Sequence, residues 1–556
     1  MKIWNPLSAM TRGVANLFGR GSQHVRLAGY RREALRLPSH LILLAALAFV
    51  AFGYGFLYAL TAPFQMMAMI APIAVLALLI VWALPPGDYA PRRTLEPLYL
   101  AFFAALVMWP VYLAIALPNL PWITLVRLFA TPLVFLLLIC ISASKAFRQE
   151  LAQVITSDRW VWRLLIALVI SQTATIFYST NPDVSFNKYL IYQTYWTSIF
   201  FVSCYLFSQP GFAERWTRMF IIMGYVICFY GIWEVRLGLV PWAGHIPNFL
   251  RIEDESVLRS LAGVVRSAKG IHRVQSVSTT PLGMSELLGL MAPFAIHLVM
   301  TSRSMVMRIM AAAFLPLALQ LVLLADSRLG MVALLGAVMG YILIWGALLW
   351  RRSRHSLFAP ALVLTYPAIF SLTLAATFLV GRVRNHVWGT GTSAASTASR
   401  STQWEHAIPK IMTHPFGHGI GRAARNLGFV NPAGVLTIDS YYLTLLMDVG
   451  IFGFVVYFAM FFRGVWISAR AVIRGRVEGE LGLLLPMGVA LLNFVVVKSV
   501  FSQDSNHPAV FMMLGAVVAL GHRATVAAGG EVRVKVPVVQ APGLGGAIPA
   551  LRLRPR

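Results

Sequence analysis

The sequence predicts an all-α polytopic membrane protein with about 14 transmembrane helices and two long external loops. Three observations lead to this fold class. The chain has 58% hydrophobic and 12% charged residues, whereas a soluble domain has roughly 25% charged residues. Apolar runs of about 20 residues, the length that crosses a bilayer, recur along the chain. Basic residues concentrate in alternate connections between these runs, which is typical of cytoplasmic loops.

Each apolar run defines one expected span. The expected spans are residues 41–62, 64–84, 97–117, 120–143, 160–178, 186–208, 217–239, 280–301, 305–325, 329–350, 357–380, 441–462, 481–500 and 506–522. This membrane domain, 41–522, is expected to follow a basic cytoplasmic segment, 1–40, and to precede a disordered cytoplasmic tail, 523–556. The net charge of +26 belongs mostly to the cytoplasmic loops and ends, so we do not expect a nucleic-acid partner.

The charge of the short loops sets the expected topology, with both ends of the chain in the cytoplasm. The inner loops at 85–96, 144–159 and 463–480 contain basic residues, while the outer loops at 179–184 and 502–506 have none. Because every short loop follows the rule, one missed or invented span would break the pattern downstream.

Two long outer loops, 240–279 and 381–440, also contain arginine. Long loops cross the membrane regardless of their charge, so the topology stands. Contact with anionic headgroups is one explanation for these arginines. A binding site is the other, and three of them, Arg273, Arg328 and Arg400, are expected near the membrane surface on one side. Guanidinium groups bind phosphate oxygens through paired hydrogen bonds, so this set could hold a lipid-linked pyrophosphate. A salt bridge to a loop carboxylate is the alternative for each arginine alone.

Six charged residues lie within the expected spans, where each costs roughly 2.5–3.5 kcal/mol on insertion scales. They are Arg127, Lys188, Glu234, Glu286, Asp448 and Lys498. All six are expected in the outer halves of their spans. The long side chains of Lys188 and Lys498 could reach the headgroups. The shorter carboxylates of Glu286 and Asp448 suggest instead a polar cavity beneath the two long loops.

Asp439 precedes the expected span 441–462 and has two possible roles. A carboxylate there could take a proton from an attacking hydroxyl group. It could equally cap the helix by accepting hydrogen bonds from free backbone amides, which position alone favours. The long outer loop 381–440, called the insert below, also contains three histidines. They are His406, His414 and His418, and their spacing is not that of an established metal-ligand motif, so we expect no metal site.

Two strings within this region, RSTQWEHAIPKIMTHPFGHGIG and DSYYLTLLMDVGIFGF, resemble the signature of the O-antigen ligase and polysaccharide polymerase superfamily. The matching residues are Arg400, Trp404, Pro415 with Gly419 and Gly421, Asp439 with Ser440, and Asp448 with Gly450 and Gly453. The segments RVQSVSTTP and DSRLG, which contain Arg273 and Arg328, also resemble family landmarks. The resemblance covers residues 260–465.

The resemblance implies a GT-C-like glycosyltransferase architecture and a metal-independent, inverting transfer of a glycan from undecaprenyl pyrophosphate. The reaction would occur at the periplasmic face of a bacterial inner membrane, without a cofactor. Ligases of the superfamily have a histidine where this chain has Asp439, so we favour a polymerase of exopolysaccharide or O-antigen. A chain-length regulator and an export complex are possible partners.

Catalytic roles are expected for Asp439, Arg273 and Arg400. Substrate binding is expected for Arg328, Arg259, Arg422, Trp404, Glu286 and Asp448. Arg259 stands eleven residues before Gly270, a spacing proposed for substrate-handling loops of bacterial polysaccharide polymerases, although a basic, glycine-containing loop reaches it easily by chance.

Three rival functions stay open from the sequence. A ligase would move the glycan to lipid A core or to a protein. A flippase or transporter of lipid-linked sugars would need charges at mid-membrane and matching broken helices in two halves, which the sequence does not show. A scaffold of a synthesis complex would leave the outer arginines dispensable.

Overall fold

A computed structural model of the chain describes residues 76–529 except for short gaps. The gaps are residues 83, 85–90, 118–121, 253–256, 259–260, 262–271, 353–354, 356, 382–393, 432–433 and 475–476. The basic segment 1–40, the first expected span, most of the second, Arg259 and the end of the tail therefore lie outside the described residues.

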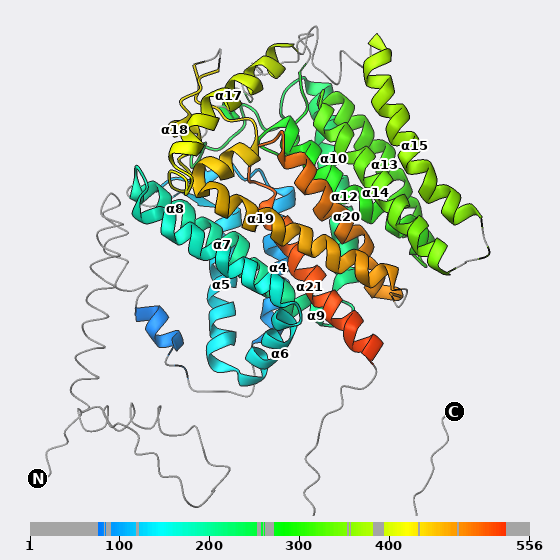
Figure 1. Cartoon of the computed structure of the whole chain (residues 1–556). Helices are drawn as coiled ribbons and strands as arrows, with labels where there is room; N and C mark the ends of the chain where they lie inside the picture. The colour runs from blue at the N-terminus through cyan, green and yellow to red at the C-terminus, as the bar shows by residue number, and fades with distance from the viewer. Residues whose placement is uncertain are drawn as a thin grey trace, which may run out of the picture.

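Helices form at every expected span from 97–117 onward (Figure 1). Their bounds are α4 (Arg92–Met108), α5 (Leu125–Ala143), α7 (Arg159–Phe177), α8 (Pro182–Tyr192) continued by η1 (Gln193–Thr197) and α9 (Ser198–Ser208), α10 (Phe212–Leu237), α12 (Pro281–Thr301), α13 (Met305–Leu324), α14 (Arg328–Arg352), α15 (Phe358–Leu379), α19 (Tyr441–Ile473), η3 (Gly479–Leu483) with α20 (Leu484–Lys498), and α21 (His507–Gly529). Nine helices within the described residues are long and apolar enough to cross a membrane. The chain is thus an all-α, multi-pass membrane protein.

The third and fourth expected spans differ from prediction. Helix α4 starts at Arg92 and stops at Met108, because Trp109 precedes a proline and takes an extended conformation. Helix α5 begins only after Thr124, whose side chain accepts a hydrogen bond from the Arg127 amide. The residues between them form strands β1 (Ala114–Ile115) and β2 (Ile123–Thr124), and β3 (Leu250–Arg251) completes an antiparallel sheet in the order β2-β1-β3. This sheet joins the loop before α5 to the long loop after α10.

Two expected inner loops are also more helical than predicted. The segment 144–159 contains α6 (Lys145–Thr156), capped by the Ser144 hydroxyl. Helix α19 does not end near residue 462 but continues to Ile473, so its arginines after that point lie on a helix. The amphipathic order of apolar residues in α6, with Phe147, Leu151 and Val154 buried, could have revealed the first of these helices.

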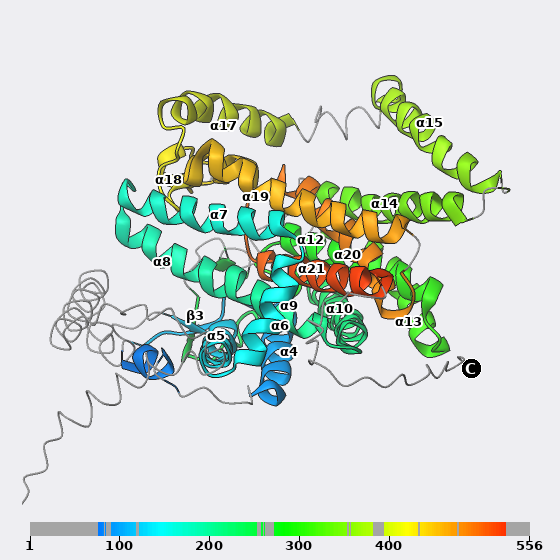
Figure 2. The same ribbon diagram turned by 60° about the horizontal axis from the view of Figure 1, so that its bottom comes forward.

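The middle of the bundle consists of α12, α20 and α21. The spanning windows of α12 and α21 are 78% buried by protein, compared with 28% for α13 and α14 at the rim (Figure 2). Small residues permit this close packing. A side chain at Gly289 would collide with Ala333, and one at Gly515 would collide with the backbone of Phe200, so α12 approaches α14 and α21 approaches α9 closely.

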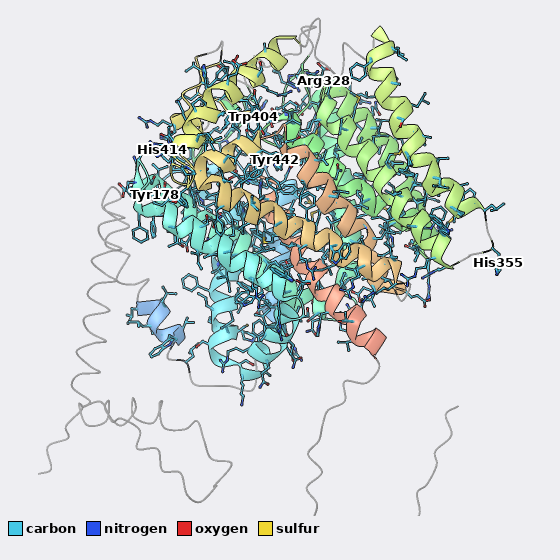
Figure 3. All side chains as sticks on the ribbon, in the orientation of Figure 1. Tyr178, Arg328, His355, Trp404, His414 and Tyr442 are labelled. Atoms are coloured by element: carbon cyan, nitrogen blue, oxygen red, sulfur yellow. The ribbon has the colours of Figure 1, made fainter. Side chains whose placement is uncertain are left out.

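Loops assigned to the same side of the membrane contact one another. The insert end of the bundle unites residues 178–188, 272–283, 325–328, 398–431, 434–440 and 499–506, as in the hydrogen bonds Tyr178 to Phe416 and Thr280 to Gln503. The opposite end unites residues 157–158, 211–213, 463–474, 477–480 and 521–525, as in the ion pairs Arg463–Asp158 and Arg523–Glu480. Figure 3 places Arg328 and Trp404 toward the insert end and His355 at the far end.

Candidate functional site

A buried carboxylate in α10 holds the segment that contains Arg273. Glu234 is fully buried and accepts hydrogen bonds from the backbone amides of Gln275 and Ser276, the latter at 2.6 Å. The Nε2 atom of His272 lies 2.7 Å from the same carboxylate. These donors compensate an acidic group that would otherwise be costly to bury. Glu234 therefore holds the side chain of His272 before Arg273 and the backbone of Gln275 and Ser276 after it.

Arg273 connects this segment to the turn before α14. Its Nε donates a hydrogen bond to the backbone carbonyl oxygen of Ala325 at 2.9 Å, and a terminal nitrogen donates to the backbone carbonyl oxygen of Asp326 at 3.4 Å. Burial lowers the pKa of the Arg273 guanidinium, and the nearby Asp326 carboxylate opposes this shift. Arg328 follows two residues later as the first residue of α14. The structure thus places Arg273 against the turn that carries Arg328.

The third arginine of the predicted set lies on α17 (Ala394–Thr413), which packs across the start of α19 (Figures 1 and 2). Burial lowers the pKa of the Arg400 guanidinium, the negative charge of Asp439 opposes this shift, and the positive charge of Arg328 adds to it. Arg400 is therefore close enough to both residues for their charges to act on it. Its Nε is buried and has no hydrogen-bond partner among the described residues.

Asp439 is held by a residue that the sequence analysis missed. The Gln403 side chain, 1% exposed, donates from Nε2 to Oδ2 of Asp439 at 3.0 Å and accepts from the Asp439 amide at 2.9 Å. The N-cap of α19 is the next residue, Ser440. The helix cap favoured from position alone is therefore wrong, because the carboxylate of Asp439 points to α17 rather than to the first amides of α19. The Ser440 hydroxyl is buried and has no partner in the described part of the chain.

A second buried carboxylate, that of Asp448, binds the backbone of residues 421–423 in the insert. Asp448, 3% exposed, accepts hydrogen bonds from the backbone amides of Gly421, Arg422 and Ala423 at 2.9, 2.9 and 2.7 Å. These amides begin the short helix α18 (Ala423–Leu427). Within the described residues, the hydrogen bonds of the Asp448 carboxylate all go to the loop backbone. These contacts give Asp448 a role in positioning the loop, and its predicted role in substrate binding stays a prediction.

The loop of Asp448 fits into a break in α19. Gly450 has φ 71° and ψ −173°, a conformation open essentially to glycine alone. The break frees backbone groups that pair with the turn 415–419, since His418 donates to Met447 at 2.8 Å and Ile451 donates to Pro415 at 2.9 Å. A side chain on Gly450 would collide with the carbonyl oxygen of Pro415. The glycines of the family motif therefore permit a close crossing of two backbones.

Trp404 and Arg422 also contact the scaffold of the insert, and their predicted roles in substrate binding stay predictions. Trp404 packs against a small core formed by Ala407, Ile411, Ala423, Leu427, Leu443 and Met447. Arg422 is 8% exposed, and its Nε donates to Thr180, at the end of the outer loop before α8, at 3.1 Å. The spacing of Trp404, Ala407 and Ile411, which is that of one helix face, could have shown the first role from sequence.

Two ion pairs lie under the insert, one fully buried and one with side chains that are 32% exposed. Glu286 and Lys498, both fully buried side chains, are 2.8 Å apart, and Asn506 donates to the other oxygen of Glu286 at 2.8 Å. Lys188 pairs with Asp504 at 2.7 Å. Lys188 and Lys498 therefore do not reach for headgroups as the sequence suggested, because each has a carboxylate partner inside the protein. Glu286 belongs to this internal network, and among the described residues it forms no hydrogen bond or ion pair with Asp439. Its predicted role in substrate binding stays a prediction.

The histidines of the insert stay apart from any acidic cluster. The rings of His414 and His418 are 4.8 Å apart, and the His418 ring contacts the Met447 carbonyl. Within the described residues, no group of three His, Cys, Asp or Glu side chains could hold a metal ion.

The fold and these contacts define a multi-pass membrane protein with arginines and one carboxylate grouped at the insert end. Residues 311–458, from α13 to the first half of α19, match the model of the O-antigen ligase family. This match, over less than half of the chain, agrees with the resemblance of the motifs and supports a membrane enzyme of the glycan ligase or polymerase type. No curated protein matches the chain.

Proposed function

We propose that the protein is a polysaccharide polymerase that extends lipid-linked glycans at the periplasmic face of a bacterial inner membrane. The donor is a glycan on undecaprenyl pyrophosphate, and the acceptor is a hydroxyl group of another lipid-linked repeat unit. The observation that carries this proposal is the grouping of Arg400, Arg328 and Asp439, with a buried Arg400 Nε that lacks a partner in the described residues. A buried, unpaired guanidinium donor is costly unless an anionic ligand satisfies it.

The reaction follows from these positions. Arg273, Arg328 and Arg400 bind the pyrophosphate and stabilise the negative charge that develops as it leaves. The acceptor oxygen attacks the anomeric carbon from the opposite side, which inverts its configuration. The bond between that carbon and the pyrophosphate oxygen breaks, and undecaprenyl pyrophosphate departs. The acceptor proton passes to Asp439, whose orientation is fixed by Gln403. Because the leaving group is already activated, orientation and charge stabilisation suffice without a metal.

Arg400→Ala and Arg273→Ala test the proposal. Each should reduce formation of long-chain glycan by about 100-fold or more, the usual cost of removing one donor to a developing anion. Purified full-length variants are incubated with lipid-linked repeat units, and the products are sized on gels. Arg425→Ala is the matched control, because Arg425 is an exposed arginine of the same insert. Normal polymer length with both site variants would refute the assignment.

A ligase is the second candidate, because the matched family model is described as O-antigen ligase. The aspartate at position 439, where ligases have a histidine, favours the polymerase. The acceptor decides between them. With lipid-linked repeats as both donor and acceptor, a polymerase gives products of several repeat lengths, whereas a ligase leaves them unchanged until lipid A core or an acceptor protein is added.

A further inference from the structure

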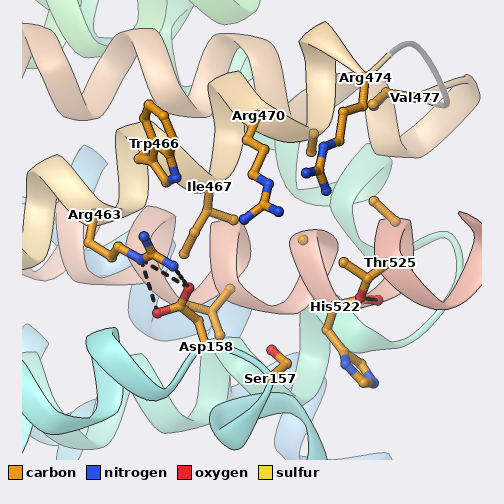
Figure 4. Close-up of a pocket in the computed structure, with 14 residues that line it drawn as sticks. Ser157, Asp158, Arg463, Trp466, Ile467, Arg470, Arg474, Val477, His522 and Thr525 are labelled. Atoms are coloured by element: carbon orange, nitrogen blue, oxygen red, sulfur yellow. Dashed lines mark hydrogen bonds and ion pairs between the residues drawn. The ribbon is translucent and has the colours of Figure 1, made fainter. Parts of the chain in front are cut away.

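A cavity with both basic and apolar lining lies at the opposite end of the bundle, away from the arginine site. Its volume is about 510 Å³, and it is formed where the last turns of α19 and α21 meet the start of α7 (Figure 4). Its lining includes Arg463, Arg470, Arg474, His522, Trp466 and Ile467. The cavity thus combines a basic side with an indole and aliphatic side chains.

The basic side is a consequence of the unexpected length of α19. The sequence suggested that these arginines occupy a loop, but the helix continues to Ile473 and is capped at Arg474. Arg463, Arg470 and Arg474 are separated by seven and four residues, so they share one face of the helix. Figure 4 shows the side chains of Arg470 and Arg474 directed from α19 into the space beside α21.

The three arginines differ in their partners. Arg463 binds Asp158 through Nε and a terminal nitrogen, at 3.0 and 2.6 Å, while Asp158 also caps α7. Arg470 and Arg474 are exposed and form no ion pair or side-chain hydrogen bond with the described residues. Other arginines at this end are engaged, as in Arg215 with Glu96 and Arg523 with Glu480. The cavity therefore has three guanidinium groups and one carboxylate, an excess of positive charge.

We propose that this cavity binds the phosphate group of an anionic phospholipid from the adjacent leaflet. Arg470 and Arg474 bind the phosphate oxygens, and Trp466 and Ile467 contact the glycerol and the upper acyl chains. Basic pockets between membrane helices are suited to acidic headgroups. The apolar side distinguishes a lipid from free phosphate, which has no use for it. This site is separate from glycan transfer, so it does not depend on the function proposed above.

A simpler explanation is that Arg470 and Arg474 only complement the negative end of the α19 dipole. That role would stabilise the protein equally in any lipid. A lipid site predicts instead a stabilisation that depends on the anionic headgroup, because a ligand that binds only the folded protein raises its melting temperature with concentration.

The experiment is a thermal titration of the purified full-length protein in neutral detergent, followed by tryptophan fluorescence. Phosphatidylglycerol should raise the melting temperature, whereas phosphatidylcholine with the same acyl chains should not. The double variant R470Q/R474Q should need on the order of tenfold more phosphatidylglycerol for the same rise, because charge-assisted hydrogen bonds to phosphate are lost. R474Q alone, at the end of the helix, serves if the double variant does not fold.

The matched control is R159Q/R163Q, a pair of exposed arginines four residues apart at the same end of the bundle and outside the cavity. It should respond to phosphatidylglycerol as the wild type does. Three results would overturn the proposal: an unchanged response of R470Q/R474Q, an equal loss in the control, or an equal rise with inorganic phosphate alone. The last would assign the cavity to a soluble anion.

Discussion

Two loops at the insert end are anchored in the same way but present their arginines differently. Glu234 binds the backbone around Arg273, and Asp448 binds the backbone of Arg422 and its neighbours. Both carboxylates are buried and both accept amide hydrogen bonds from a loop. The guanidinium of Arg273 then extends to the turn before Arg328, whereas that of Arg422 extends to Thr180 in the scaffold.

The difference shows that a buried acid in a membrane helix does not by itself indicate a reacting group. Each acid fixes a backbone, and the role of the arginine in that backbone depends on what its own side chain contacts. On this basis we propose Arg273 for the pyrophosphate site, whereas Arg422 joins the insert to the loop before α8. The following experiments test this division.

The largest effect is expected where the Asp448 loop enters α19. Gly450→Ala places a Cβ against the Pro415 carbonyl in a conformation that only glycine adopts readily. We therefore expect the free energy of unfolding to decrease by roughly 2–6 kcal/mol and polymer formation to be abolished. Gly428→Ala is the control, because Gly428 also has a positive φ of 70° but no atom within 4 Å of an added Cβ. It should cost only about 1–2 kcal/mol. If Gly450→Ala and Gly428→Ala lowered the melting temperature and the amount of polymer equally, the close backbone crossing at Gly450 would not be the cause of the loss.

Arg273→Gln and Arg422→Gln compare the two arginines directly. The first should lower polymer formation by about 100-fold, because it removes a donor to the leaving pyrophosphate. The second should lower it by less than about tenfold, since it removes one hydrogen bond between scaffold elements, worth about 1 kcal/mol. Turnover with saturating lipid-linked substrate is the measurement. If Arg422→Gln is the more damaging variant while both proteins melt alike, the assignment of the two loops is reversed.

Glu234→Gln tests whether Glu234 affects turnover by holding Arg273 in position. The amide keeps one acceptor but cannot satisfy all the donors around it, so Arg273 loses its fixed position and turnover should drop by about tenfold. As a positioning residue, Glu234 should add nothing once Arg273 is gone. The double variant E234Q/R273Q should therefore match R273Q within about twofold. Additive losses would mean that Glu234 contributes to the reaction by another route.

The sequence predicted the helices from patterns within one segment, whereas the common side of Arg273, Arg328 and Arg400, which lie on separate segments, was expected from the topology. Hydropathy indicates a span without any knowledge of its neighbours, and the motif placed Arg400 near Asp439. The β-sheet was missed because two-residue strands leave no pattern. Gln403 was missed because a glutamine on a polar helix carries no signal. The pairing of Lys498 with Glu286 depends on how α12 and α20 meet, which local sequence does not encode.

The smallest expected effect is a pH dependence of the Asp448 loop. Burial lowers the pKa of His418, the Met447 carbonyl opposes this shift, and the charges of His414 and Lys410 add to it. The folded protein therefore binds fewer protons than the unfolded chain, in which a histidine titrates near pH 6.5. The contribution of the neutral His418 ring to the free energy of unfolding is fully present above about pH 6.5. It decreases as the pH falls toward the lowered pKa of His418. The melting temperature of His418→Gln should consequently decrease less between pH 7.5 and 5.5 than that of the wild type. His406→Gln, at an exposed position on α17, should follow the wild type, and a steeper decrease in His418→Gln would contradict the assigned direction.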